Sequence, residues 1–169
     1  MLIRISGISD AHGIASVHVD SWRSAYIGII PDNYLKAISI HERERRWNSI
    51  LSMEGSKTYI AELNNRIVAF MNFGSHRRIL SLNHGEIYAI YAVREIWGRG
   101  VGHALMKKAI SYMVDEECSK ISVNVLLRNI RGMNFYKKHG FSIVAKSARS
   151  LTIGSAILQE VEMILNISK

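Results

Sequence analysis

The chain has 169 residues, a length that fits a single domain over 1–169 with a hydrophobic core of its own. Hydrophobic residues make up 48% of the sequence, which argues against disorder, and no apolar run is long enough to cross a membrane. The 22 Lys and Arg against 14 acids give a net charge of +8, which suits either an anionic ligand or a solvated surface. The one cysteine, Cys118, excludes an internal disulfide and indicates a cytoplasmic protein.

Hydrophobic periodicity divides the chain into strands and helices. Apolar residues at every second position indicate a strand, and apolar residues three or four positions apart indicate a helix. In chain order we expect a strand at 2–5, a helix at 10–26, a helical region at 31–51 broken near Ser39, a hairpin of strands at 57–62 and 66–73, a strand at 86–93, a helix at 102–117, a strand at 120–127, a helix at 130–139, and strands at 141–148 and 156–165.

Local signals at the element ends support this order. Ser9-Asp10 offers an N-cap to the first helix, and Asn64-Asn65 suits a tight turn within the hairpin. The order β-α-α-β-β-β-α-β-α-β-β contains strand-helix-strand crossovers as well as a hairpin. It predicts an α/β fold with a mixed sheet of about seven strands flanked by about four helices.

A glycine-rich turn, Trp97-Gly-Arg-Gly100-Val-Gly102, joins the strand 86–93 to the helix that follows. Glycines so closely spaced do not suit the interior of a strand or helix. At the positive end of a helix dipole, such a turn presents free backbone N–H groups and predicts a phosphate-binding site. By itself the pattern is also typical of an ordinary turn. A dinucleotide fingerprint would need glycine where His103 stands, and a nucleotide-triphosphate loop would need Gly-Lys-Ser/Thr.

A second motif follows the strand 120–127 and contains Asn129, Phe135-Tyr136 and Gly140-Phe141. Together the two motifs resemble those of the GNAT superfamily of acetyl-coenzyme A-dependent N-acetyltransferases, Gln/Arg-x-x-Gly-x-Gly/Ala and Asn-x-x-Ala-x-x-Phe-Tyr-x-x-x-Gly-Phe. The resemblance is sharp over 86–145 and looser elsewhere, and it implies the same mixed-sheet fold.

Two residues depart from the family's motifs. Trp97 stands where Gln or Arg is usual, and Gly132 stands where Ala is usual. Because the turn would bind mainly through backbone N–H groups, we expect the first change to weaken cofactor binding without abolishing it. The second keeps a close approach but lowers helix propensity.

The resemblance implies acetyl-coenzyme A as cosubstrate and assigns residues to it. Ile90, Tyr91 and Ala92 would lie along the pantetheine arm, Asn129 would contact it from the other side, and Tyr136 would face the thiol. The pyrophosphate would be held by Gly98, Arg99, Gly100, Val101, Gly102 and His103. A backbone N–H near Ile90 would stabilise the oxyanion, a role that does not depend on the side chain.

Two residues are candidates for proton transfer. Tyr136 would be the general acid, because a phenol holds its proton at neutral pH and can give it to a departing thiolate. Glu86 would be the general base, as in the histone-type branch of the family; the alternatives are an ordered water and, more weakly, His84. Other branches place an acid at the position of Asn124, which cannot accept a proton. Glu86 could also be a solvated acid at a strand end.

The acceptor is expected to be a primary amine of a small molecule or peptide, bound near His18, Trp22, Tyr26 and the region 74–85. Residues 1–93 carry ten Lys or Arg and eight acids, so no strongly acidic pocket is indicated. A non-catalytic coenzyme A-binding sensor is the main alternative function, and a homodimer is left open.

Two further classes of ligand are not expected. The basic residues are spread along helices and no nucleic-acid motif occurs, so a nucleic-acid partner is a weaker alternative. The seven histidines show no ligand spacing with cysteine or acids, so we predict no metal.

Overall fold

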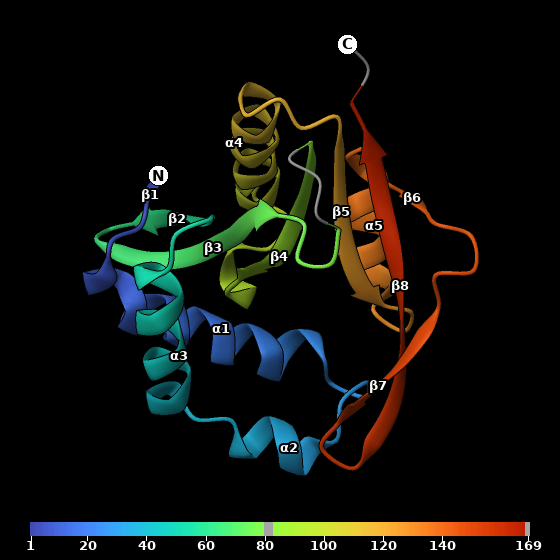
Figure 1. Cartoon of the computed structure of the whole chain (residues 1–169). Helices are drawn as coiled ribbons and strands as arrows, with labels where there is room; N and C mark the ends of the chain where they lie inside the picture. Colours follow the sequence, from blue (N-terminus) through green and yellow to red (C-terminus); the bar gives the residue numbers. More distant parts are fainter. Residues whose placement is uncertain (80–82, 168–169) are drawn as a thin grey trace.

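The structure, a computed structural model, describes residues 1–79 and 83–167, and Figure 1 shows a central sheet with helices on both sides. Its strands are β1 (Leu2–Ile5), β2 (Ser56–Leu63), β3 (Arg66–Ser75), β4 (His84–Ala92), β5 (Lys120–Leu126), β6 (Ser142–Ile143), β7 (Arg149–Ile153) and β8 (Ala156–Asn166). Its α-helices are α1 (Ala11–Ala25), α2 (Asp32–Ala37), α3 (Ile40–Ser52), α4 (Val101–Asp115) and α5 (Ile130–Lys138), with short 3-10 turns η1 (Ile8–Asp10) and η2 (Arg94–Ile96).

The strands form one mixed sheet in the order β1-β2-β3-β4-β5-β8-β6, and β7 pairs with β8. β4 and β5 run parallel, and the other strand pairs of the described residues are antiparallel. The predicted mixed sheet flanked by helices is therefore confirmed, although it has eight strands where about seven were expected.

The difference in strand number arises at the C-terminal end. The strand predicted at 141–148 is reduced to Ser142–Ile143, and Lys146 adopts a left-handed φ of 58° that interrupts it. β7 then forms a hairpin with β8, in which Ile153 pairs with Ala156 across Gly154, whose φ is 59°. Glycine and serine at 154–155 are a usual turn pair, so the sequence carried a signal for this hairpin that the prediction did not use.

Local signals at the other element ends have mixed outcomes. The helical region predicted at 31–51 breaks at Ser39, whose hydroxyl accepts the Glu42 amide as the N-cap of α3. Asn64 and Asn65 adopt φ of 51° and 59° in the β2–β3 turn, as expected for a type I′ hairpin. Asp10 stands at the N-cap position of α1, as expected, but its carboxylate makes no capping hydrogen bond and binds the Arg4 guanidinium and the Gly7 amide instead.

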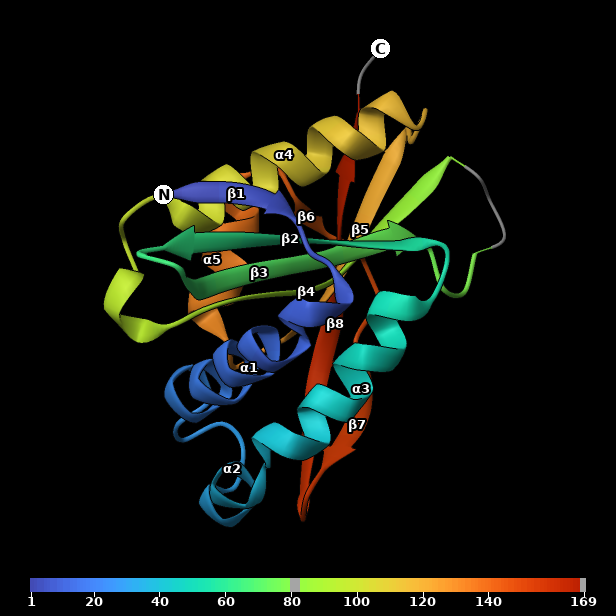
Figure 2. The same cartoon turned by 90° about the vertical axis from the view of Figure 1, so that its left-hand side faces the viewer.

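Helices cover both faces of the β2–β4 part of the sheet. Figure 2 shows α4 on one face and α1 with α3 on the other. The core between them contains fully buried Phe70, Ile87 and Leu105. The methionines that the sequence suggested as core-filling residues are buried, namely Met71, Met106, Met113 and Met133. In the described part of the chain, no helix is both apolar enough and long enough to cross a membrane.

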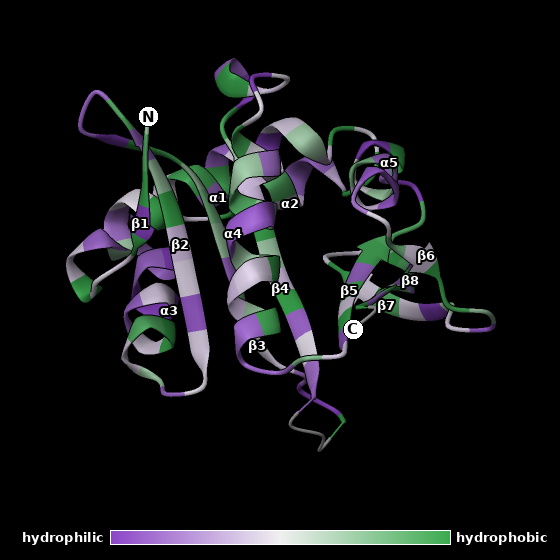
Figure 3. Ribbon diagram, turned by 90° about the horizontal axis from the view of Figure 1, so that it is seen from above, coloured by the Kyte–Doolittle hydropathy of each residue, from purple (hydrophilic) through white to green (hydrophobic). Residues whose placement is uncertain are grey.

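The feature that positions the site is a divergence of β4 from β5. Their pairing runs from His84↔Lys120 to Ile87↔Val123 and is not continued by the rest of the two strands, all of which the structure describes. A register shift between β3 and β4 at Asn72/Phe73 bends β4 at this point. Figure 3 shows α4 over β4 and α5 beside β5 and β8, so the helices of the two motifs flank the divergence.

Candidate active site

A pocket of about 530 Å³ opens where β4 and β5 separate. It is lined by the second half of β4, the glycine-rich turn, α5, and the C-terminal end of α1. The structure brings together all the predicted cofactor residues except Arg99: Ile90, Tyr91, Ala92, Gly98, Gly100, Val101, Gly102, His103, Asn129 and Tyr136. The proposed acid Tyr136 therefore lines the pocket, whereas the proposed base Glu86 does not.

The glycine-rich turn has a backbone that favours glycine and leaves space for a ligand. Gly98 and Gly100 have φ of 77° and 79°, and a Cβ built at either would meet no atom within 4 Å. Gly100 is the N-cap of α4 and supplies no side chain to bond the first helical amides. A Cβ at Gly102 would lie 3.2 Å from Phe135 Cε2, so α4 begins close against α5. The first amides of α4 thus lack a capping side chain and lie next to open space, an arrangement that suits an anion.

Asn129 starts α5 and lies against Gly132, one of the two departures from the family's motif. Its Oδ1 accepts the Gly132 amide at 2.9 Å, which makes it the helix N-cap. A Cβ at residue 132 would lie 2.6 Å from Asn129 Nδ2. With the Asn129 side chain placed as it is here, alanine at residue 132 would require that side chain to shift.

Trp97 and Arg131 form a contact that sequence reasoning missed. Trp97 Nε1 donates to the carbonyl oxygen of Ala92 at 2.8 Å, which fixes the indole, and Arg131 Cζ lies 3.3 Å from the centre of the indole ring. Both residues line the pocket. The two lie far apart in sequence, so their contact could not be read from spacing along one helix.

Tyr136 is buried, at 7% exposure, beside two other tyrosines. Burial, and secondarily the neighbouring Tyr91, raise the pKa of Tyr136 well above its usual value. The Tyr91 hydroxyl lies 3.1 Å from that of Tyr26, and burial raises the pKa of both. Tyr136 consequently carries its proton throughout the neutral range and can donate it into the pocket.

Glu86 lies behind the pocket wall, at 2% exposure. Its Oε2 accepts the Arg77 backbone amide at 3.0 Å and Arg77 Nε at 3.1 Å, and its Oε1 accepts Arg77 Nη2 and, at 3.4 Å, Asn124 Nδ2. Burial alone would raise the pKa of Glu86, but the hydrogen bonds and charge of Arg77 outweigh it and leave that pKa below its usual value. Both carboxylate oxygens are thus already engaged, and the base role of Glu86 stays a prediction.

Comparison with known proteins places this geometry in a family. The sequence profile of the Acetyltransferase (GNAT) family matches residues 19–141. A Bacillus subtilis (strain 168) protein named Uncharacterized N-acetyltransferase YuaI is 32% identical over 160 residues, which is 94% of this chain and 89% of that protein. The chain belongs to the GNAT family of acetyltransferases. It is thus an acyltransferase, as the two sequence motifs predicted.

Solved structures share the fold of this GNAT protein. PaiA N-acetyltransferase from Thermoplasma acidophilum, in complex with coenzyme A, has a TM-score of 0.76 and 23% identity, over 98% of this chain and 99% of that one. The putative acetyltransferase YncA from Salmonella typhimurium, with its cofactor acetyl-CoA, has a TM-score of 0.76 and 17% identity, over 100% and 95% of the two chains. At these identities the likeness establishes the fold alone.

The end of the pocket away from the glycine-rich turn is mainly apolar. Its lining comes from α1, the segment after it, β7 and β8, and consists of Trp22, Ala25, Tyr26, Ile30, Leu151, Ile153 and Glu160. Glu160 Oε1 accepts Arg149 Nε at 2.5 Å, so its charge is compensated. This end of the GNAT pocket therefore suits an apolar group better than a polycation.

Part of the acceptor region expected from the sequence lies elsewhere. His18 does not line the pocket; it stacks on Tyr91 with ring centres 5.0 Å apart and receives Trp47 Nε1 at 3.2 Å. Burial, with help from nearby arginines, lowers the pKa of His18 to about 3. Of the region 74–85, residues 80–82 are outside the described part, and no described residue of it lines the pocket.

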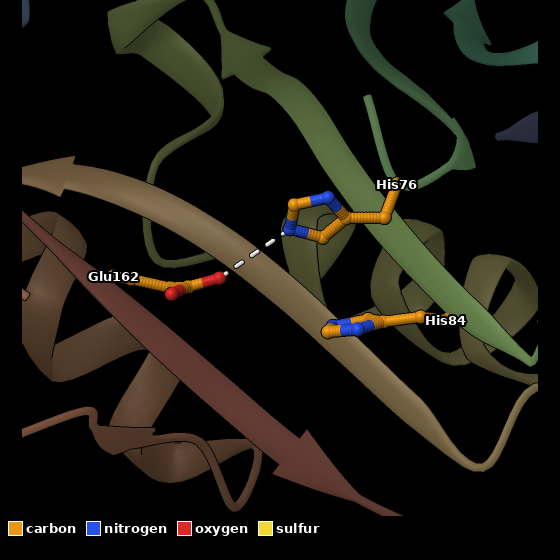
Figure 4. Close-up of side chains that lie close together, drawn as sticks. All are labelled: His76, His84 and Glu162. Atoms are coloured by element: carbon orange, nitrogen blue, oxygen red, sulfur yellow. Dashed lines mark hydrogen bonds and ion pairs between the residues drawn. The ribbon is translucent and has the colours of Figure 1, made fainter. Parts of the chain in front are cut away.

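Two histidines and a glutamate form a separate cluster (Figure 4). His76 Nε2 lies 3.4 Å from Glu162 Oε1, His84 Nε2 lies 2.6 Å from Ser122 Oγ, and the candidate ligand atoms of His76, His84 and Glu162 all lie within 4.8 Å of one another. His76 Nδ1 accepts the amides of Arg78 and Ile79, both at 3.1 Å, so the ring proton sits on Nε2 and points to Glu162. A metal ion would have to displace that proton. His84, the weaker candidate base, is buried here outside the pocket.

Proposed function

We propose that this chain binds acetyl-coenzyme A in the pocket between β4 and β5 and transfers the acetyl group directly to a primary amine. The observation that carries the proposal is that the glycine-rich turn, the part of β4 beyond its pairing with β5, and Tyr136 all line the same pocket. The coenzyme A and acetyl-CoA complexes of the two structural neighbours support this choice of cosubstrate. The whole of 1–169 would act as one acetyltransferase domain.

The pocket can support both halves of the transfer. Backbone N–H groups of β4 beyond Ile87 are freed from β5 and would hydrogen-bond the thioester oxygen as it gains charge. The amine nitrogen bonds to the carbonyl carbon as the carbon–sulfur bond breaks. Tyr136 gives its proton to the departing sulfur. The proton that the acylated nitrogen loses then restores the Tyr136 hydroxyl. The products are an amide and free coenzyme A, and no covalent enzyme intermediate is required.

The amine must be neutral before it attacks. We propose that water, rather than Glu86 itself, receives its proton, because both Glu86 oxygens already accept hydrogen bonds behind the wall. The apolar lining also disfavours the charged ammonium and lowers the cost of losing this proton. Glu86 would then serve as a positioning residue that holds the side-chain amide of Asn124 at the pocket edge.

The lining also supports a class of acceptor. An amine attached to an apolar body would bury that body against Trp22, Leu151 and Ile153. A polyamine would leave ammonium groups against the same apolar surface without a free carboxylate, which costs free energy. We therefore propose aryl- or alkylamines, or peptides with an apolar first residue, ahead of polyamines.

Thiol release tests the proposed function. The purified chain is mixed with acetyl-coenzyme A and a panel of amines matched in pKa but differing in apolar area, and free thiol is followed with a chromogenic disulfide. We expect turnover that rises with apolar area. Coenzyme A binding without turnover on any amine would instead indicate a non-catalytic sensor, and absence of coenzyme A binding would refute both functions.

A further inference from the structure

The cation of Arg131 is held at the pocket without an acidic partner. Arg131 is the second residue of α5 and belongs to the pocket lining. Among residues 1–79 and 83–167, no carboxylate forms an ion pair with it. Arg131 is exposed, and its partial desolvation lowers its pKa from the usual arginine value.

The indole of Trp97 fixes where that cation lies. Trp97 Nε1 donates to Ala92 O at 2.8 Å, so the ring is tied to the end of β4 beside the glycine-rich turn. The Arg131 guanidinium lies over the ring face, with Cζ 3.3 Å from its centre, an arrangement in which the ring electrons attract the cation. Stacking leaves the N–H groups at the edge of the guanidinium available to another partner.

The neighbours of this pair are suited to an anion. Gly98 follows Trp97 directly, and Gly100, two residues further on, is the N-cap at which the open N-terminus of α4 begins. Lys138 also lines the pocket, and no acid lies in the turn 97–100. A guanidinium can bind two phosphate oxygens at once, which a lone backbone amide cannot do.

We propose that Arg131, held on the face of Trp97, forms an anion site for a phosphate of coenzyme A. This inference rests on the proposed function and adds a binding residue to it. It also accounts for the departure at residue 97: in place of the polar Gln or Arg side chain usual in the turn, α5 supplies the Arg131 guanidinium, and the tryptophan holds it in place.

Titration calorimetry of the intact chain tests the site. Coenzyme A is titrated into the unaltered protein, Arg131→Gln, Arg131→Lys and the control Lys137→Gln, which removes the same charge from an exposed residue of α5 outside the pocket. We expect Arg131→Gln to weaken binding roughly tenfold or more, because a hydrogen bond to a charged group is lost. The affinity of Arg131→Lys for coenzyme A should lie between those of Arg131→Gln and the unaltered chain. Lys137→Gln should bind coenzyme A almost as tightly as the unaltered chain.

Two shortened ligands show which phosphate is bound. If the effect of Arg131→Gln vanishes with dephospho-coenzyme A, the partner is the 3′-phosphate; if it persists there and vanishes with pantetheine, the partner is the pyrophosphate. Either result supports the site. An unchanged affinity of Arg131→Gln for coenzyme A, an equal loss in Lys137→Gln, or an equal loss with pantetheine would overturn it. Failure of the unaltered chain to bind coenzyme A would overturn the proposed function together with this site, whereas the other failures concern Arg131 alone.

Discussion

Asn124 Nδ2 donates to Glu86 Oε1 at 3.4 Å, and the contact joins β5 to β4 next to their last paired residues, Ile87 and Val123. Asn124 faces the pocket, whereas Glu86 lies behind it and is held by Arg77. The family resemblance had made these two positions alternatives for an acid. In the structure they form one unit, in which the carboxylate orients the amide.

Replacing Glu86 by glutamine tests whether it acts as base or as positioning residue. As a positioning residue, Glu86→Gln should lower the turnover rate less than about tenfold and leave the pH–rate profile unchanged. Loss of a general base would lower the rate by about 10²- to 10⁴-fold and remove the acidic limb of that profile. The control is Glu62→Gln, which breaks the Glu62–Arg4 pair on β2, outside the pocket.

The Glu86–Arg77 pair should make stability depend on pH. Because the pKa of Glu86 is lowered in the folded chain, its contribution is fully present above the ordinary glutamate pKa of ~4.3 and is lost as pH falls through the lower folded value. Urea unfolding at pH 7 should show Glu86→Gln destabilised by about 1–3 kcal/mol, a moderate figure because Arg77 is largely exposed and can hydrate when unpaired. The difference in unfolding free energy between the unaltered chain and Glu86→Gln should shrink as the pH falls towards 3. A gap that stays constant from pH 7 to pH 3 would rule out this pair as its source.

Tyr136→Phe should slow the chemical step and spare binding. Removal of the proton donor should lower kcat by about 10²-fold. Affinity for coenzyme A should change little, because the ring remains. As burial raises the pKa of Tyr136, its ionisation should not limit the unaltered enzyme below about pH 10. Steady-state kinetics and calorimetry measure the two effects, with Tyr112→Phe on α4, outside the pocket, as control. Equal rates for both variants would remove Tyr136 from the mechanism.

Gly100→Asp should abolish cofactor binding with a modest loss of stability. The substitution places a side chain at a φ of 79° and a negative charge at the start of α4. The backbone strain should cost about 1–2 kcal/mol, and the charge should reduce coenzyme A affinity by at least about 100-fold. Gly55→Asp is a matched control, since Gly55 has φ 89°, equally open surroundings and a place outside this pocket. Similar coenzyme A affinity in the two variants would refute the phosphate-binding role of the turn.

Gly132→Ala should lower the stability of the unaltered chain but raise the stability of a chain that lacks the Asn129 side chain. In the unaltered chain the new Cβ would collide with Asn129 Nδ2 and disturb the cap, so we expect a loss of about 1 kcal/mol. In an Asn129→Ala background the collision is gone, and the better helix propensity of alanine should stabilise by about 0.5–1 kcal/mol. Thermal unfolding of the unaltered chain, the two single variants and the double variant measures this double-mutant cycle. The same sign in both backgrounds would show that the two residues are not coupled.

The secondary structure was largely predictable because its signals are local. Apolar periodicity, the Asn64-Asn65 turn and the cap at Ser39 each involve residues a few positions apart, and the corresponding elements are present. The structure departs from the prediction where a local signal had a competing partner. Asp10 stands at the N-cap position of α1, but its carboxylate binds Arg4 from β1 in place of a capping hydrogen bond. The division of 141–153 into β6 and β7 depends on pairing with β8.

The sequence by itself determined the family, the place of the glycine-rich turn and most of the residues that line the pocket, because motif spacing and backbone freedom are carried by neighbouring residues. Only the tertiary structure decided that Arg131 lies on Trp97, that Glu86 is enclosed by Arg77 and Asn124, and that the far end of the pocket is apolar. These properties arise between side chains on different elements. Charge, burial and hydrogen bonding there depend on how the sheet opens between β4 and β5, which no local pattern specifies.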